Sequence, residues 1–349
     1  MTGGSKTVVI HPPQEVESDF IDYPYFTNLA AWMLAARLKK QGSFVHLLDA
    51  FALPGADVRG LRGERTMFGA PYAALLERLA DADFDNVVVH FTPYMLQTPY
   101  LEGLNFLLTR LRELRPEARL MGAELYTGGM HRVKPDEALL KARYPALDAF
   151  VTLEGEQTIP ELLQGEKLTE FLHRGETPAA NILCGLGELD AGLVDLEAFR
   201  AFLKTVAPLS KVRQYGVDEN TLPVHFSRGC PFACSFCTNP YKNYRALPLE
   251  ECKSLIARAE AEGFLRLFVL DDSANARKDF GALLESAAEA GLKLVFPNGL
   301  RADLLSEEVV KLLATVADEL TVSAESASAR VQKDIIGKNV SVAHVERGA

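Results

Sequence analysis

The chain has 349 residues, of which 48% are hydrophobic and 24% are charged, and at roughly 150 residues per domain this length predicts two domains. The formal net charge of -10 at pH 7 gives no general attraction for nucleic acid or for anionic membranes, so neither is expected as a partner. No signal peptide and no run of about 18 apolar residues is visible, which predicts a soluble cytoplasmic protein.

From the N-terminus to about residue 164, short apolar runs alternate with amphipathic stretches, and this rhythm predicts βαβ units around a parallel sheet. Between the first two runs, Trp32 and Met33 lie on the apolar face of an expected helix, and we assign both to the core. Gly42 stands where a glycine commonly ends a helix. The expected strands are Lys6–Ile10, Phe44–Leu48, Asn86–Phe91, Arg119–Leu125 and Ala149–Leu153.

The residues that follow these strands are candidates for ligand binding, because a doubly wound sheet binds ligands beyond the carboxyl ends of its strands. Two interpretations of Gly128 and Gly129 stay open, namely close approach of the backbone to a ligand and a plain glycine turn. The candidates at these strand ends include Pro13, Thr92, Gly128, Gly129, Glu154 and Gly155.

Residues 165–222 lose the alternating rhythm and carry scattered Gly and Pro, which predicts a connector with one or two short helices. A second alternation of strands and helices begins near Val224 and predicts a barrel or another parallel sheet. Its expected strands are 224–227, 265–270, 292–296 and 320–323, and its expected helices are 247–262, 279–290 and 306–317.

Three of the five cysteines, Cys230, Cys234 and Cys237, lie close together directly after the first strand of this second series. Such grouping indicates metal ligation in a reducing compartment rather than a disulfide scaffold. A [4Fe–4S] cluster normally takes four thiolates, so three would leave one iron open to an outside ligand. The alternatives are a structural zinc site, with His225 or Cys252 as fourth ligand, and a chance grouping of thiols.

The spacing C-x3-C-x2-C, with an aromatic residue before the last cysteine, resembles the signature loop of radical S-adenosylmethionine (SAM) enzymes. The resemblance implies a [4Fe–4S] cluster on the three cysteines, SAM on the fourth iron, reductive cleavage of SAM to a 5′-deoxyadenosyl radical, and Phe236 near the adenine. It also implies SAM-binding polar residues at the strand ends of a barrel, and an ordinary solvated strand end is the alternative for some of them. These residues are Asp271, Asp272, Asn298, Arg301, Glu325 and Ser326.

Residues 1–164 resemble the cobalamin-binding domain that precedes the barrel in one radical SAM subfamily. The matching positions include the strand-end candidates named above, and the resemblance implies that they bind cobalamin. The pattern Asp-x-His-x-x-Gly, which provides a lower-axial histidine in some cobalamin proteins, is absent here, as it often is in this subfamily. We therefore do not name His11 as a cobalt ligand.

Taken together, the sequence predicts an α/β fold with a doubly wound, Rossmann-like cobalamin-binding domain (1–164), a connector (165–222) and a partial (β/α)6 radical SAM barrel (223–349). The barrel is expected to be incomplete, since only about one helix follows Ser326. The implied function is methylation of an unactivated carbon in a small molecule or peptide, with an electron donor such as flavodoxin or ferredoxin. The alternatives are radical SAM rearrangement, cyclisation or oxidation without methyl transfer, and a non-catalytic iron–sulfur protein.

Overall fold

The computed structural model describes residues 5–18, 28–97, 102–126, 128, 134–165, 168, 170–175, 192–209, 216–239, 241–338 and 340–348. The chain forms two compact units. Unit 1 comprises residues 1–127, 133–178 and 188–219, and unit 2 comprises residues 128–132, 179–187 and 220–349. Within the described ranges, no helix has both the length and the apolar character needed to cross a membrane.

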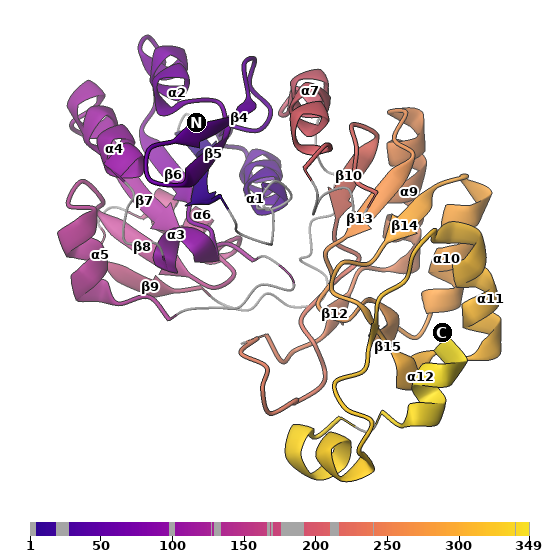
Figure 1. The fold of residues 1–349 in the computed structure, drawn as a ribbon. Helices are drawn as coiled ribbons and strands as arrows, with labels where there is room; N and C mark the ends of the chain where they lie inside the picture. The colour runs from indigo at the N-terminus through magenta and orange to yellow at the C-terminus, as the bar shows by residue number, and fades with distance from the viewer. Residues whose placement is uncertain are drawn as a thin grey trace. The chain divides into compact units, whose positions relative to one another are not determined.

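Unit 1 is built on a six-stranded parallel sheet with the strand order β3-β1-β6-β7-β8-β9 (Figure 1). The parallel sheet and its five predicted strands are confirmed. The sixth strand, β9, was not predicted, because its three residues are too few to show a hydrophobic pattern. The strands are β1 (Lys6–His11), β3 (Phe44–Asp49), β6 (Asn86–His90), β7 (Arg119–Ala123), β8 (Ala149–Thr152) and β9 (Leu172–Arg174).

Helices accompany this sheet, whose central strand β6 is buried along its whole length. The first helix, α1, is buried over most of its length, and Trp32 and Met33 lie in the core as predicted. The turn after α1 contains Gly42 with a φ of +88°, a left-handed conformation that glycine adopts at low cost. The helices of unit 1 are α1 (Leu29–Lys40), α2 (Tyr72–Leu79), α3 (Pro93–Gln97), α4 (Glu102–Leu114), α5 (Glu137–Arg143), α6 (Thr158–Gln164) and α7 (Leu196–Val206).

A small antiparallel sheet, with the order β2-β5-β4, also belongs to unit 1 and was not predicted. Its strands are β2 (Gln14–Glu17), β4 (Asp57–Leu61) and β5 (Arg65–Gly69). They alternate polar and apolar residues only briefly, and Glu15 on β2 forms an ion pair with Arg65 on β5. Short polar strands of this kind carry little of the periodic signal that identifies a strand in a sequence.

Asp49 ties the end of β3 to helix α1. One carboxylate oxygen accepts hydrogen bonds from Trp32 Nε1 at 2.6 Å and Asn28 Nδ2 at 2.8 Å, and the other accepts from the Phe51 amide at 2.9 Å. Burial raises the pKa of Asp49 to about 6, although these hydrogen bonds act in the opposite direction. The Asp49 carboxylate therefore serves the fold of unit 1.

We expect the wild-type protein to lose stability relative to Asp49→Asn as the pH rises from about 4 to 6. The Asp49 carboxyl has an ordinary pKa of 3.8 and a folded pKa of about 6, so between these values the folded state binds more protons than the unfolded state. At about 1.4 kcal/mol per pKa unit, the loss is at most about 3 kcal/mol. Urea unfolding of both proteins across this pH range measures it, and a difference that does not change with pH would contradict the raised pKa.

Unit 2 contains a parallel sheet with the order β10-β13-β14 and a parallel pair, β15-β16. Helices α9, α10 and α11 lie along one side of these strands (Figure 1) and confirm the three helices predicted there. The elements are β10 (Thr221–Val224), β13 (Arg266–Val269), β14 (Lys293–Val295), β15 (Leu300–Arg301), β16 (Val322–Ser323), α9 (Leu249–Ala261), α10 (Phe280–Glu289), α11 (Glu307–Val316), the π-helical turn η6 (Val331–Ile336) and α12 (Val342–Gly348).

The first strand of unit 2 begins three residues before the predicted one, which ran from 224 to 227. Strand β10 includes Pro223, and a proline within an apolar run normally argues against predicting a strand there. It is tolerated here because β10 lies at the edge of its three-stranded sheet. The residues that follow form a separate strand, β11 (Ser227–Arg228), which pairs antiparallel with β12 (Arg245–Ala246).

Candidate active site

The three clustered cysteines lie on a loop that the antiparallel pair β11 and β12 closes at its base. The Cys230 amide donates to the Tyr241 carbonyl at 2.9 Å, which joins the two arms of the loop. Gly229 has a φ of +77°, and a Cβ there would lie 2.5 Å from the Asn243 carbonyl oxygen. Only glycine therefore fits directly before the first cysteine.

The middle of this loop is held by the turn η6. The Ser235 amide donates to the Ile336 carbonyl at 2.9 Å, and the Ser235 hydroxyl donates to the Ile335 carbonyl at 2.8 Å. Between the second and third cysteines, the Cys237 amide donates to the Cys234 carbonyl at 3.1 Å. Backbone hydrogen bonds thus fix the loop on both sides of Cys234.

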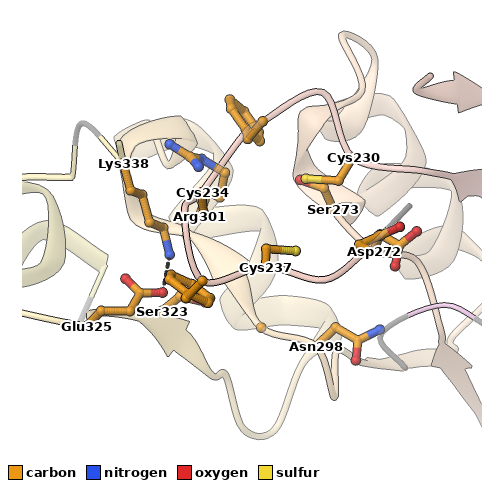
Figure 2. A pocket seen from close by; sticks show the side chains of 14 residues that line it. Cys230, Cys234, Cys237, Asp272, Ser273, Asn298, Arg301, Ser323, Glu325 and Lys338 are labelled. Atoms are coloured by element: carbon orange, nitrogen blue, oxygen red, sulfur yellow. Dashed lines mark hydrogen bonds and ion pairs between the residues drawn. The ribbon is translucent and has the colours of Figure 1, made fainter. Parts of the chain in front are cut away.

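All three cysteine side chains line one cavity of about 880 Å³, part of it open to solvent (Figure 2). Five further residues predicted for the SAM site line the same cavity, so the fold brings together eight of the ten residues predicted for the cluster and SAM. The lining residues are Cys230, Phe232, Cys234, Phe236, Cys237, Asn239, Asp272, Ser273, Asn298, Gly299, Arg301, Ser323, Glu325 and Lys338.

Asp271 and Ser326, both predicted to bind SAM, do not line this cavity. Asp271 is buried and accepts hydrogen bonds from the Phe226 amide at 2.8 Å and the Ser227 hydroxyl at 2.6 Å. The Ser326 carbonyl accepts from Gln332 Nε2 at 2.9 Å. Both residues therefore hold the segments that frame the cavity.

Two aromatic side chains and one guanidinium contribute apolar and cationic surface to the cavity. Arg301 lies with its guanidinium carbon 3.6 Å from the centre of the Phe232 ring, an arrangement that favours a cation–π contact. Its guanidinium also donates to both carboxylate oxygens of Asp303, at 3.0 and 2.8 Å. Phe236, for which the family resemblance implies a position near the adenine, is 55% exposed and presents free apolar surface.

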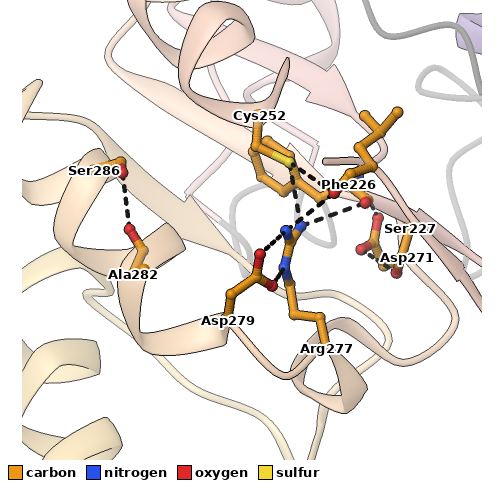
Figure 3. A network of polar contacts seen from close by, with 9 residues as sticks. Phe226, Ser227, Cys252, Asp271, Arg277, Asp279, Ala282 and Ser286 are labelled. Atoms are coloured by element: carbon orange, nitrogen blue, oxygen red, sulfur yellow. Dashed lines mark hydrogen bonds and ion pairs between the residues drawn. The ribbon is translucent and has the colours of Figure 1, made fainter. Parts of the chain in front are cut away.

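A buried arginine holds the two ends of the cysteine loop together (Figure 3). Arg277 donates to the carbonyls of Phe226, before the loop, and Leu247, after it, at 3.4 and 3.2 Å. It also donates to both carboxylate oxygens of Asp279 and, at 3.2 Å, to the Cys252 sulfur. Cys252 is thus a partner of Arg277 outside the cavity lining, and it is not gathered with the other three cysteines.

The thiols of the loop must lose their protons before they can bind iron. Burial raises the pKa of Cys230, and the nearby Asp272 carboxylate raises it further. Among the described residues, no set of three His, Cys, Asp or Glu side chains is gathered closely enough for a single metal ion. A [4Fe–4S] cluster has a different requirement, because each cysteine binds its own iron.

At the carboxyl end of the unit 1 sheet, two buried histidines meet. His11 ends β1, His90 ends β6, and their Nδ1 atoms lie 3.0 Å apart. Burial lowers the pKa of His90 to about 3 and lowers that of His11 well below its ordinary value, so both rings are neutral. Because β3 and β6 lie on opposite sides of β1, the strand order reverses here, which is where open α/β sheets bind ligands.

The predicted residues after β1 and β6 are linked to each other within unit 1. Thr92 is buried, and its hydroxyl donates to Gln14 Oε1 at 2.7 Å. Gln14 Nε2 in turn donates to the Pro12 carbonyl at 2.9 Å, next to the buried Pro13. The loops that follow the two strands are therefore fixed to one another at the strand-order reversal.

The remaining predicted residues of this group differ in their surroundings. Glu154 and Gly155 follow β8 and are buried, and the preceding Leu153 has a left-handed φ of +65°. A Cβ on Gly128 would lie 1.8 Å from the Leu270 carbonyl oxygen, so a close approach to protein backbone already requires glycine there. Gly129 lies outside the described residues. Binding of a cofactor by any of these four residues stays a prediction.

Six lining residues of the cavity were missed by the sequence reading. Ser273, Gly299 and Ser323 are sequence neighbours of predicted residues, so their placement followed from the same strand ends. Phe232 and Asn239 flank the cysteines in the same loop. Lys338 gave no signal, because it lies far along the chain in a segment with no predicted role.

Comparison with known proteins gives three kinds of similarity. Residues 224–349 match the family model described as the radical SAM superfamily. The hopanoid C-3 methylase of Methylococcus capsulatus is 29% identical over an alignment covering 56% of this chain and 38% of that protein. This chain therefore spans about two fifths of the curated relative it matches.

Two solved structures of the radical SAM methyltransferase TsrM from Kitasatospora setae share the fold at 16% identity. The structure with tryptophan and a SAM analogue bound has a TM-score of 0.68, covering 99% of this chain and 65% of TsrM. The structure with cobalamin and a [4Fe–4S] cluster bound has a TM-score of 0.64, covering 99% and 66%. At this identity the likeness shows the fold alone.

Proposed function

From the match of residues 224–349 to the radical SAM superfamily, we propose that the chain is a cobalamin-dependent radical SAM methyltransferase acting on an unactivated carbon. Support comes above all from one cavity in which three cysteine thiols lie beside carboxylate, amide and cationic side chains. The named activities of the hopanoid methylase and of TsrM are also methyl transfers. We propose that unit 2 is part of a (β/α)6 barrel and that unit 1 is a Rossmann-like cobalamin-binding domain.

The donor set of the cavity fits a [4Fe–4S] cluster with one open iron, held by Cys230, Cys234 and Cys237. Beside the thiols, Asp272, Asn298 and Glu325 offer acceptors and donors that suit the ammonium and hydroxyl groups of SAM. When bound, the cluster supplies the electron that cleaves SAM, and cobalamin supplies a carrier for the methyl group.

The histidine pair of unit 1 fits a ligand rich in carboxamides, such as cobalamin. The Nε2 atoms of His11 and His90 are buried without a hydrogen-bond partner in the described structure. In a neutral pair joined through Nδ1, one Nε2 carries a proton and the other is a bare acceptor. A carboxamide has both an acceptor and donors, and it would satisfy either atom, each of which otherwise costs about 1–3 kcal/mol.

Protein groups then have three tasks in the proposed reaction. Arg277 and Asp271 hold the cysteine loop, the cavity residues orient SAM, and the strand-end residues of unit 1 orient the corrinoid. The substrate would be a small molecule or a peptide, and the electron donor a flavodoxin or ferredoxin. A reducing cytoplasm suits these requirements, since the described thiols are all free.

The test is anaerobic cluster reconstitution followed by reduction in the presence of SAM, with products measured by mass spectrometry. We expect 5′-deoxyadenosine together with S-adenosylhomocysteine. Deoxyadenosine without S-adenosylhomocysteine would favour rearrangement, cyclisation or oxidation. A protein that holds four irons and yields neither product would favour a non-catalytic iron–sulfur role.

Cobalamin binding has its own measurement. Protein purified with added hydroxocobalamin is expected to retain one corrinoid per chain, visible in its absorption spectrum after gel filtration. The corrinoid bands are measured before iron loading as well as after it, so that absorption by the cluster does not affect the first measurement. Failure to retain any corrinoid would contradict the cobalamin part of the proposal and leave the radical SAM part standing.

A further inference from the structure

Exposed cations border the cysteine loop at its base and beside its middle. Residues 226–246, which form the loop and the strands at its base, contain three basic residues and no Asp or Glu, although the whole chain has a formal net charge of -10. Arg228 and Arg245 are buried, whereas Lys242 is exposed. Burial raises the pKa of Cys230, and the charge of Lys242 acts in the opposite direction, so this lysine lies near the first thiol.

The turn η6 adds exposed cations beside the middle of the loop. The carbonyls of its last two residues accept hydrogen bonds from Ser235, which lies between the second and third cysteines. Arg330, at the start of the turn, and Lys333 are exposed, and Asp334 is the exposed acidic residue that accompanies them. Ile335 is 51% exposed and adds apolar surface. Three exposed cations, one carboxylate and one apolar side chain therefore lie next to the loop.

The three exposed cations have no ionic partner inside the described structure. Lys242, Arg330 and Lys333 form no ion pair with a described carboxylate, whereas Lys293 in the same unit pairs with Asp318 at 3.0 Å. Unpaired surface charges contribute little to the stability of a fold, but they attract a partner of opposite charge and speed its approach. The cations around the loop are therefore available to an acidic partner.

Resting on the proposed function, we infer that the basic surface formed by Lys242, Arg330 and Lys333 docks a small acidic electron-carrier protein. SAM cleavage consumes one electron, which has to enter through the cysteine loop. The reduced carrier is oxidised by one electron and the cluster is reduced by one, with no transfer of a proton or a group. Electron-transfer encounters bury little surface, below about 1,200 Å², so a few complementary charges beside the loop can guide one.

The test follows reduction of the cluster itself on the full-length, cluster-loaded protein. Excess reduced flavodoxin is mixed with the oxidised protein, and rapid-freeze EPR, which separates the reduced cluster from the flavin, gives the rate constant. We expect Lys242→Glu combined with Lys333→Glu to lower this constant by about 10- to 100-fold at low salt, because charge steering changes association rates by about 10- to 1000-fold. Added salt should slow the wild type steeply and the variant hardly at all.

Two controls separate docking from other effects. Lys311→Glu makes the same change of charge at an exposed position of α11 and should slow reduction by flavodoxin by less than about twofold. Dithionite is a small reductant that needs no docking surface. It should therefore reduce the clusters of the wild type and of the double variant at rates within about twofold of each other.

Other outcomes would overturn the inference. Equal rates with flavodoxin in the wild type and the double variant would contradict it, and so would equal slowing with dithionite. If Lys242→Glu prevents cluster loading because it lies near Cys230, Arg330→Glu combined with Lys333→Glu leaves the loop unchanged, and wild-type rates in that variant would exclude the docking surface. A wild-type protein that holds no cluster, or whose dithionite-reduced cluster cleaves no SAM, would instead contradict the proposed function.

Discussion

Replacing Cys234 by alanine is expected to remove nearly all of the iron that the reconstituted protein holds. The backbone contacts around Cys234 survive in this variant, because the Cys237 amide binds the Cys234 carbonyl and Ser235 binds the turn η6. Only the thiol is lost, so the variant tests ligation rather than loop structure. We expect deoxyadenosine formation to fall by at least about 100-fold, since changes even outside the ligand set cost 10- to 100-fold in metal affinity.

The chain offers a matched control in its other described cysteine. Cys252→Ala removes a buried thiol that contacts Arg277 and does not line the cavity, so iron content should stay at the wild-type value. Iron and sulfide analysis with the absorption spectrum of the reconstituted proteins provides the comparison. Equal loss of iron in both variants, or a full four irons in Cys234→Ala, would contradict the ligand assignment.

Arg277→Met is expected to lower the free energy of unfolding by about 2–4 kcal/mol. The Arg277 side chain is fully buried, and its loss leaves the Leu247 carbonyl without its guanidinium donor and the Asp279 carboxylate without its cation. Water can reach Asp279, which is 39% exposed, and this keeps the loss below that of a fully buried pair. Since Arg277 joins both ends of the cysteine loop, iron retention should fall as well.

Urea unfolding of the protein before iron loading measures this effect separately from the cluster. Arg330→Met removes an exposed arginine and should change the unfolding free energy by less than about 0.5 kcal/mol. Arg277→Lys keeps the charge but cannot reach the carbonyls and Asp279 at once, so we expect an intermediate loss. A stability of Arg277→Met equal to that of the wild type would show that the network of Figure 3 does not hold the loop.

The fold could be predicted from sequence where both faces of a strand are buried. Strand β6 has three consecutive buried valines at its centre, and helices such as α4 repeat apolar residues at helical spacing, so their patterns are strong. Two strands lack such patterns. β9 has only three residues, and in β2 the single apolar residue Val16 lies between Glu15 and Glu17. The start of β10 was misplaced because Pro223 is compatible with a strand only at a sheet edge, and edge position is not visible in a sequence.

The candidate site could be predicted where its residues share a loop or follow a strand. The cysteine spacing located the loop, and the strand ends located Asp272, Asn298 and Arg301. Lys338 was missed because lysine is usually solvated, and only the fold returns this segment to the cavity. His90 was missed for a related reason, since its meeting with His11 depends on the pairing of β1 with β6.

Ser235 in the cysteine loop donates hydrogen bonds to the turn η6. The order of the loop and the order of this turn are therefore energetically coupled. Energetic coupling between two sites is reciprocal, so whatever the loop gains from an ordered turn, the turn gains equally from a loaded loop. Iron loading should therefore slow amide exchange in residues 331–338. An ordered turn should in the same measure slow the release of iron from the loop.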